Sequence, residues 1–398
     1  MLPHEGHYNK NRRPAQAAAG KNGRFMAEAK INFTVPTLFG LESVVAAEIK
    51  RLGLNGVRSE DGRVHAQGTL ADIPRLNIAL RSGERVLIEL GSFDALDFDA
   101  LFEGVKALPW EAFIPKNGAF PVKGYCLDSV LHSEPACQSI IKKAVAQRLA
   151  AAYGLDMLPE DGALYQIQFS LFKDRAALLL DTTGPALYKR GYRKGNVLAP
   201  LRETLAAGLV QLMRYRGKEP FLDPHCGSGT ICIEAALIAQ GRAPGLDRSF
   251  AAQKWPVISG EDWSRAAEEA LDKEFHGSYD IMACDIDPHA LRAAKQNIEA
   301  AGLENIVRCR RMDSTRLTAE TDSGIIVTNP PYGQRLLEAE QASEHIQAFG
   351  AACSNLPDGW RVGVISPQKD FETLFGRKAD KRRKLYNGKL ACQFYMFG

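Results

Sequence analysis

Four consecutive residues, Asn329-Pro330-Pro331-Tyr332, follow a short β-branched run at residues 325–327, where a strand would end. Proline lacks an N–H and fixes φ, so the turn is stiff, and the Asn329 side chain and the Pro330 carbonyl can converge as acceptors on one point. Two converging acceptors suit the two hydrogens of an amino group, while Tyr332 can stack on an unstacked base. The motif therefore predicts catalytic roles for Asn329, Pro330 and Tyr332 on the exocyclic amine of a base.

A glycine-rich loop lies earlier in the chain, in FLDPHCGSGTICIE at residues 221–234. Gly227 and Gly229 allow positive φ, and the helix that follows offers free N–H groups. A dinucleotide or P-loop site is disfavoured because Cys232 replaces the third glycine and no Gly-Lys-Ser/Thr is present. Asp223 would repel a pyrophosphate but suits the cationic amino-acid end of S-adenosylmethionine. The loop indicates a cofactor site, and a tight turn without a ligand is the alternative.

Two further aspartates stand where the next strands would end. Asp285 is placed at a carboxyl edge, where the hydroxyls of a ribose can be held. Asp287, just before Pro288, is assigned to capping the next helix. Asp313 can accept a hydrogen bond from an adenine amine, or it is an ordinary surface aspartate. A sulfonium donor is already activated, so the chemistry needs placement and a dry site rather than a metal.

The elements that must position these residues form two kinds of pattern. After residue 200, strands ending at 223, 285, 310 and 328 alternate with helical segments, which predicts a parallel doubly wound sheet. Before it, mixed strands and helices with few catalytic-looking polar clusters favour a binding module. An insertion must occupy roughly 242–278, and its Trp255 and Trp263 are expected to pack over the sheet rather than line the substrate side. Residues 1–28 look like a disordered basic tail, ahead of a possible native start near Met26.

The net charge of +3 is too small to demonstrate a polyanionic partner, so the position of the charge matters. A linker at 184–194 (GPALYKRGYRK) and a run at 381–384 (KRRK) combine cations with tyrosines, which suits contact with phosphates and bases. An ordinary solvated surface is the alternative for each. The RNA-binding candidates are Lys189, Arg190, Tyr192, Arg193, Lys194, Arg382, Arg383 and Lys384.

Eight cysteines occur without a CxxC pair or a Cys/His cluster at zinc-ligand spacing. They are expected to be reduced, buried thiols, and no metal site is expected. No apolar run approaches the ~20 residues that a membrane-spanning helix needs. A cytoplasmic protein without a membrane partner is therefore expected, and the sequence leaves its oligomeric state open.

Together, the motifs resemble the class I AdoMet-dependent amino-methyltransferases and, more narrowly, the THUMP-domain RNA methyltransferases. The segments that carry the resemblance are GYRK (191–194), APLRETLAA (199–207), DPHCGSGT (223–230), DID (285–287), TNPPYGQR (328–335) and LYNG (385–388). The resemblance implies an α/β fold with a C-terminal Rossmann-like methyltransferase domain at 188–398. A ferredoxin-like segment at 29–69 and a THUMP RNA-binding domain at 70–187, both α+β, would precede it.

The resemblance also implies S-adenosylmethionine as cofactor and RNA as partner. Bacterial members methylate N2 of guanine in 23S rRNA, and relatives do so in tRNA. The implied cofactor contacts are Asp223, Cys226, Gly227, Gly229, Thr230, Asp285, Ile286, Asp313 and Asn329. The segment 196–201 would lie near the methionine end. The chain departs from the family in its basic tail and in lacking the second methyltransferase domain of the fused bacterial enzymes.

Two other functions stay open. A DNA adenine-N6 or cytosine-N4 methylase, or an enzyme for another RNA base amine, would use the same motif, because N-P-P-Y selects an amine and not one base. A catalytically silent RNA-binding or ribosome-assembly factor would keep the N-terminal half. It would have no need of the glycine loop, Asp285 and N-P-P-Y together, so we expect an enzyme.

Overall fold

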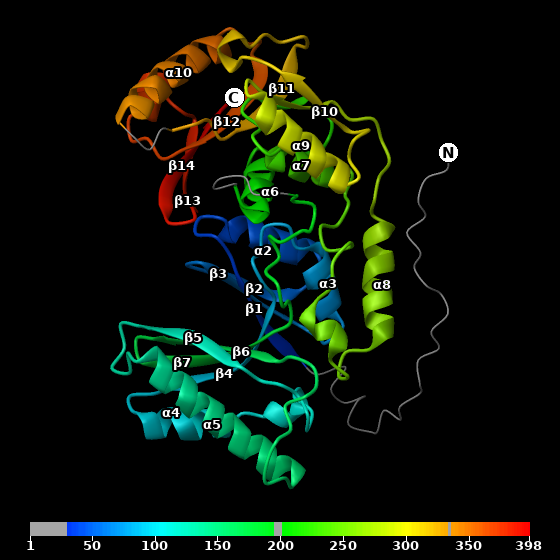
Figure 1. Cartoon of the computed structure of the whole chain (residues 1–398), viewed down its shortest axis with the longest axis vertical. Helices are drawn as coiled ribbons and strands as arrows, with labels where there is room; N and C mark the ends of the chain where they lie inside the picture. Colours follow the sequence, from blue (N-terminus) through cyan, green and yellow to red (C-terminus); the bar gives the residue numbers. More distant parts are fainter. Residues whose placement is uncertain (1–29, 195–200, 333–335) are drawn as a thin grey trace.

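The computed structural model describes residues 30–194, 201–332 and 336–398 (Figure 1), and for residues 336–339 it describes the backbone alone. The predicted tail at 1–28, most of the segment expected beside the methionine end, and residues 333–335 of the N-P-P-Y segment lie outside the described residues. The chain forms two seven-stranded sheets, one in the N-terminal half and one in the C-terminal half. In Figure 1 the N-terminal sheet lies below the C-terminal one.

The N-terminal sheet has the order β2-β3-β1-β4-β7-β6-β5. Its elements are β1 (Ile31–Pro36), α2 (Glu42–Arg51), β2 (Asn55–Glu60), β3 (Arg63–Gly68), α3 (Asp72–Ala79), β4 (Leu87–Asp94), α4 (Phe98–Lys106), η1 (Trp110–Ala112), β5 (Val122–Leu127), α5 (Glu134–Tyr153), β6 (Gln166–Phe172) and β7 (Arg175–Asp181). β4 pairs with β1 on one side and with β7 on the other, so a single sheet runs through both predicted N-terminal units. The ferredoxin-like unit therefore needs α3 and β4, which follow the expected boundary at residue 69.

The C-terminal sheet has the order β10-β9-β8-β11-β12-β14-β13. Its elements are α6 (Glu203–Leu212), β8 (Phe221–Asp223), α7 (Thr230–Ala239), β9 (Ile281–Asp285), α9 (Pro288–Ala300), β10 (Val307–Arg311), η3 (Ser314–Arg316), β11 (Ser323–Thr328), α10 (Leu336–Ser354), β12 (Gly359–Ser366), α11 (Phe371–Phe375), β13 (Lys381–Asn387) and β14 (Leu390–Phe397). The first five strands of that order are parallel, as predicted, and β14 and β13 are antiparallel additions.

Helices cover both faces of the C-terminal sheet. Ile325 and Val327 of β11 pack in a core with α6, α7 and α9, whereas Ile326 packs with α10 and α11. Successive side chains of a strand point to opposite faces, which explains this division and the continuous apolar run. β8 and β11 are neighbours although two strands separate them in the chain. The strand order reverses there, and ligands of such sheets bind at the carboxyl ends of the strands beside that reversal.

The predicted insertion at 242–278 contains η2 (Ala251–Lys254) and α8 (Gly260–Leu271). Its tryptophans do pack, but in the core of the N-terminal half and not over the methyltransferase sheet. Trp255 stacks on Tyr165 with 4.6 Å between ring centroids, and Trp263 stacks on Phe250. α8 lies beside α3 (Figure 1), where Arg75 Nε is 2.8 Å from Glu269 Oε2. The insertion thus fixes the methyltransferase domain against the N-terminal half.

All eight cysteines are free thiols, and five of them are buried. Across the described ranges, no helix is long and apolar enough to span a membrane. Within the same ranges, no group of three or more His, Cys, Asp or Glu side chains is arranged to hold a metal ion.

Candidate active site

Asp223 ends β8 and is 1% exposed. Its Oδ1 accepts hydrogen bonds from Thr328 Oγ1 at 2.7 Å and from the His225 N–H at 3.1 Å. Its Oδ2 is buried and has no partner among the described residues. Burial raises the pKa of Asp223 to about 7, and nearby Asp285 adds to the effect. A buried carboxylate with one free oxygen is suited to a cationic ligand.

The two glycines of the loop, Gly227 and Gly229, have different surroundings. A Cβ at Gly229, where φ is +80°, would lie 3.2 Å from the Cβ of Ala294, so this glycine allows α9 to pack against the loop. A Cβ at Gly227, where φ is +52°, would meet nothing within 4 Å. Gly227 therefore borders open space, and its N–H donates to Asp285 Oδ2 at 2.9 Å.

The neighbours of these glycines face inward. Cys226 is buried, its N–H donates to the Cys284 carbonyl, and burial raises the pKa of its thiol. Thr230 is also buried, and its hydroxyl is 3.2 Å from both Ser228 Oγ and an Arg193 nitrogen. The Thr230 hydroxyl is thus already engaged within the protein.

Asp285 is half-buried at the end of β9 and braces the loop. Besides accepting from Gly227, it accepts from the N–H of Asp287 at 2.9 Å through Oδ1. Asp287 in turn caps α9 by accepting from the His289 N–H, which confirms the cap expected for this residue. Ile286 between them is 58% exposed, an apolar side chain at the mouth of the loop.

Asp313 follows β10 and begins η3. Its Oδ1 accepts from the Thr315 N–H at 3.0 Å and from the Thr315 hydroxyl at 2.7 Å, and these bonds lower the pKa of Asp313. Its Oδ2 is 3.8 Å from Arg316 Nε. Asp313 is therefore held as a carboxylate at the sheet edge, with its orientation fixed by Thr315.

The N-P-P-Y segment begins directly after β11. Asn329 and Tyr332 are half-buried and Pro330 is buried. Tyr332 has a side-chain hydrogen bond with Asn387 at the end of β13, while burial raises the pKa of its hydroxyl. The Thr328–Asp223 hydrogen bond joins the residue before Asn329 to the glycine loop, so the two motifs form one site.

His225 is a site residue that the sequence interpretation missed. Its Nδ1 is 3.0 Å from Thr328 Oγ1, and its Nε2 is 2.7 Å from His345 Nε2 and 2.8 Å from Ser314 Oγ. Because Thr328 donates its proton to Asp223, the His225 Nδ1–H must donate to Thr328, and Nε2 is left as an acceptor. Burial lowers the pKa of His225 to about 3, so the ring is neutral. His225 thereby fixes the hydroxyl beside Asn329.

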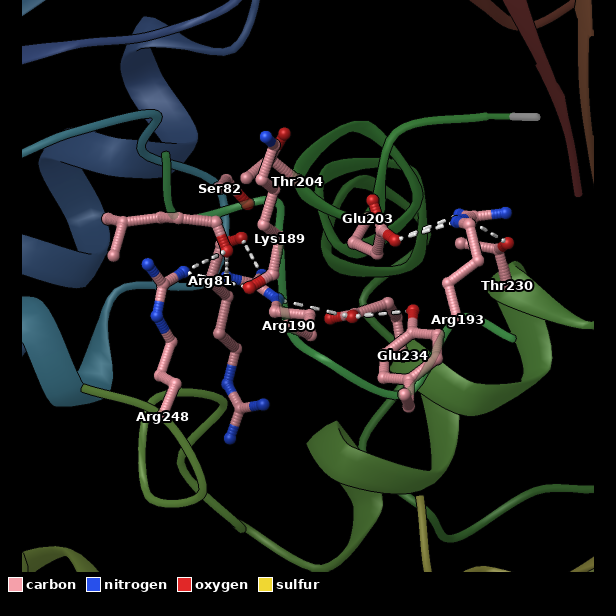
Figure 2. A network of polar contacts seen from close by, with 12 residues as sticks. Arg81, Ser82, Lys189, Arg190, Arg193, Glu203, Thr204, Thr230, Glu234 and Arg248 are labelled. Atoms are coloured by element: carbon pink, nitrogen blue, oxygen red, sulfur yellow. Dashed lines mark hydrogen bonds and ion pairs between the residues drawn. The ribbon is translucent and has the colours of Figure 1, made fainter. Parts of the chain in front are cut away.

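The linker at 184–194 holds three of the predicted RNA-binding residues in contacts inside the protein. Figure 2 shows Arg190 and Arg193 directed toward carboxylates of the methyltransferase domain. Arg190 is 6% exposed, pairs with Glu234 at 3.4 Å and donates to the carbonyls of Leu187 and Arg81. Tyr192 is 5% exposed, and its hydroxyl is 3.2 Å from Glu234 Oε1.

Arg193 is used in the same way. Its guanidinium binds Glu203 at 2.9 Å and also donates to Ser228, Leu201 and Thr230. Arg190 and Tyr192 are buried and the Arg193 guanidinium is occupied by protein groups, which argues against the prediction that these three side chains contact RNA. They form an internal clasp that joins the linker to the glycine loop and to α7. Lys189 and Lys194 remain exposed.

The second basic run lies on β13, at the edge of the sheet. Arg382 is 3.2 Å from Glu372 of α11, whereas the Lys384 ammonium is exposed and lies 5.7 Å from the Tyr386 ring centroid. Arg383 makes one long contact of 3.5 Å to Ser43 Oγ. This run therefore stays on the surface, unlike the linker.

Comparison with known proteins agrees with this architecture. Residues 190–396 match the model of the RMKL-like methyltransferase domain, 32–87 match the RlmL ferredoxin-like domain, and 95–181 match the THUMP domain. The ferredoxin-like match includes α3 and the start of β4, in keeping with the sheet topology.

Individual relatives cover most of the chain. The putative RNA methyltransferase YpsC of Bacillus subtilis is 42% identical over 364 residues, which is 90% of this chain and 93% of YpsC. The ribosomal RNA large subunit methyltransferase K/L of Marinobacter nauticus is 33% identical over 374 residues, which is 90% of this chain but 51% of that protein. The chain thus spans about half the length of the K/L relatives.

The crystal structure of SMU.472, a putative methyltransferase complexed with SAH, superposes with a TM-score of 0.89 at 38% identity, and the match covers 93% of this chain and 98% of that one. SAH is the product that S-adenosylmethionine leaves after methyl transfer. The chain therefore belongs to the RMKL-like methyltransferase family, with ferredoxin-like and THUMP domains before a class I methyltransferase domain, and S-adenosylmethionine is its methyl donor.

Proposed function

We propose that this chain methylates the exocyclic N2 amine of a guanine in RNA, with large-subunit rRNA as the substrate. The observation that carries the proposal is the hydrogen bond between Asp223 and Thr328, which places N-P-P-Y beside the cofactor loop at the carboxyl edge of β8 and β11. The THUMP match and the names of YpsC and the K/L relatives support RNA as the substrate.

The residues of the loop fit the cofactor. The unpartnered Oδ2 of Asp223 offers a buried acceptor for the cationic methionine end, and the side of Gly227 without neighbouring atoms leaves space for it. Cys226, Gly229 and Thr230 would contribute backbone and shape. Asp285 would hold the ribose, and Ile286 with Asp313 would border the adenine. When bound, S-adenosylmethionine supplies a methyl group already activated by its sulfonium.

The base would be held by three groups of N-P-P-Y. The Asn329 side-chain oxygen and the Pro330 carbonyl would each accept a hydrogen bond from the amine. These two hydrogen bonds would direct the nitrogen lone pair toward the methyl group. Tyr332 would stack on the base, its ring oriented by the hydrogen bond with Asn387. No protein group has to form a covalent bond, so placement and exclusion of water would carry the rate.

An adenine-N6 or other base-amine methylase of RNA or DNA is the second candidate, because Asn329 and Pro330 would accept any exocyclic amine. Guanine in tRNA is a further variant. A non-catalytic assembly factor has less support, since the buried, unpartnered Asp223 oxygen serves no packing purpose.

Methyl transfer from labelled S-adenosylmethionine to RNA and DNA from a strain lacking this gene tests the proposal. The product would be digested and its nucleosides identified by mass spectrometry, with Asn329→Ala as the inactive control. We expect label in N2-methylguanosine of large-subunit rRNA. Label in N6-methyladenine, or label in DNA only, would overturn the substrate, and no label with a cofactor-binding protein would overturn the activity.

A further inference from the structure

A groove with a volume of about 420 Å³ lies between α2, the end of α6 and β13. Four of its lining residues are cations contributed by these three elements, and no aspartate or glutamate lines it. The cations are Arg51, Arg214, Lys381 and Arg383. They come together only when the N-terminal half packs on the methyltransferase domain.

These four cations have no carboxylate partner among the described residues. Within the parts of the chain that the structure describes, none of them lies within 4.0 Å of an acidic oxygen, and Arg383 has only its long contact with Ser43. Glu48, an acidic side chain of the same helix α2, is buried and accepts from Gln211 and from the Arg81 N–H. Arg382, which alternates with Lys381 and Arg383 along the strand, is the one that pairs with an acid, Glu372.

Arg214 reaches the groove from an unfavourable backbone conformation. The N–H of Arg214 donates to Gln211 O and the N–H of Tyr215 to Val210 O, which is the pattern that closes many helices and usually has glycine where Arg214 stands. The φ of Arg214 is +58°, a left-handed value that glycine adopts at lower cost than arginine. A strained residue kept in place of glycine is a reason to look for a role of its side chain.

Helix dipoles account for only part of this charge. Arg51 ends α2 and Arg214 follows the end of α6, so each benefits from the negative end of a helix. Lys381 and Arg383 are on a strand, where no such compensation exists. Four neighbouring cations repel one another, and a chain of phosphates entering the groove would relieve that repulsion.

The groove is connected to the site by β13 itself. Asn387, at the far end of this strand, contacts Tyr332, while Lys381 begins the strand. Six residue steps at about 3.3 Å each give roughly 20 Å between the two ends. A strand of helical nucleic acid spans the same length with about six nucleotides at about 3.4 Å each.

We propose that this groove binds the phosphate backbone of the RNA about six nucleotides from the methylated base. The proposal rests on RNA being the substrate. In this role the β13 cations act with Arg51 and Arg214 as one phosphate track that crosses the boundary between the N-terminal half and the methyltransferase domain.

The test uses Arg214→Gly, Lys381→Ala and the double variant, with RNA binding measured between 50 and 300 mM KCl on a 23S rRNA transcript. Each lost phosphate contact should reduce the slope of log K against log salt by about 0.7, which weakens binding about fivefold at 0.1 M salt. Arg214→Gly is informative because glycine suits φ of +58°. Its melting temperature should not fall, so weaker binding cannot come from misfolding.

Arg308→Ala is the matched control, since it removes one exposed cation from β10 at the opposite edge of the same sheet. Its salt slope should equal that of the unmodified protein. Unchanged slopes for both Arg214→Gly and Lys381→Ala, with the unmodified protein still methylating RNA, would overturn the groove and leave the proposed function intact. An unmodified protein that neither binds nor methylates RNA would overturn both.

Discussion

The linker at 184–194 and strand β13 are both short basic runs with tyrosines, yet the fold uses them in opposite ways. Arg190, Tyr192 and Arg193 are turned inward onto Glu234 and Glu203, whereas Lys384 remains in solvent at a sheet edge. The difference comes from the carboxylates that the methyltransferase domain brings to the linker. Composition alone predicts that a segment is basic. Whether its cations form internal ion pairs or an exposed surface depends on which carboxylates the fold places beside them.

The largest effect is expected from breaking the clasp. Glu234→Ala leaves Arg190 buried without its carboxylate, which should lower the free energy of unfolding by about 3–5 kcal/mol. Urea denaturation measures this change. The double variant Arg190→Met with Glu234→Met should recover most of the loss, because well-packed apolar residues can replace a buried ion pair. If Glu234→Ala lowers the free energy of unfolding by no more than about 0.5 kcal/mol, as a surface substitution does, the clasp does not stabilise the fold.

Asp223, which ends β8 just before the glycine loop, is the contrasting case of a buried carboxyl group with no cationic partner among the described residues. The folded pKa of Asp223 is raised to about 7 by burial, above its unfolded value. The folded state therefore holds a proton that the unfolded chain has released, and this contribution to stability is lost as pH rises from about 4 through about 7. Relative to Asp223→Asn, the cofactor-free protein should lose on the order of 4 kcal/mol across that window.

Thermal unfolding of the two proteins at pH 5 and pH 8 measures that difference, and saturating S-adenosylmethionine should reduce it for the unmodified protein only. His225 acts in the opposite direction. Its pKa in the folded protein is lowered to about 3, so the folded protein loses stability relative to the unfolded chain as pH falls below about 6.5. Comparing variants at each pH separates the two groups. Equal pH dependence of Asp223→Asn and the unmodified protein would contradict a buried, uncompensated carboxylate.

A smaller effect is expected on the exposed strand. Lys384→Ala should weaken RNA binding by a few-fold at low salt and lower the salt slope by about 0.7, with little change in stability. Tyr192→Phe, the linker counterpart, should leave RNA binding unchanged and lower stability by about 1–3 kcal/mol through the lost hydrogen bond to Glu234. Filter binding and urea unfolding of the two variants would separate them. The reverse pattern would mean that the linker, and not β13, faces the RNA.

Much of the fold follows from local pattern. The predicted strand ending at 285, the cap at Asp287 and the parallel order of the strands are confirmed, because apolar runs and capping residues carry that information within a few positions. β2 had no such signal, since its side chains are almost all exposed and show no alternation. The boundary expected at residue 69 was too early, because β4 completes the ferredoxin-like unit from beyond it.

The candidate site was only partly predictable, because some of its contacts follow from short motifs and others join residues far apart in the sequence. Asp223, Gly227 and Asp285 belong to short motifs and come together as the strand order requires. His225 gains its role from His345, 120 residues later, and Arg190 from Glu234, 44 residues later. Long-range pairs of this kind depend on how helices dock, and a single sequence does not specify them.

The central claim is that the glycine loop and N-P-P-Y form one site with separate tasks, and Asn329→Ala tests it most directly. Calorimetric binding of S-adenosylmethionine should change little, while single-turnover methylation of the RNA substrate should fall by at least 100-fold, roughly the loss of one essential transition-state contact. An Asn329→Ala protein that still methylates RNA at the normal rate, or one that loses cofactor binding, would contradict the account.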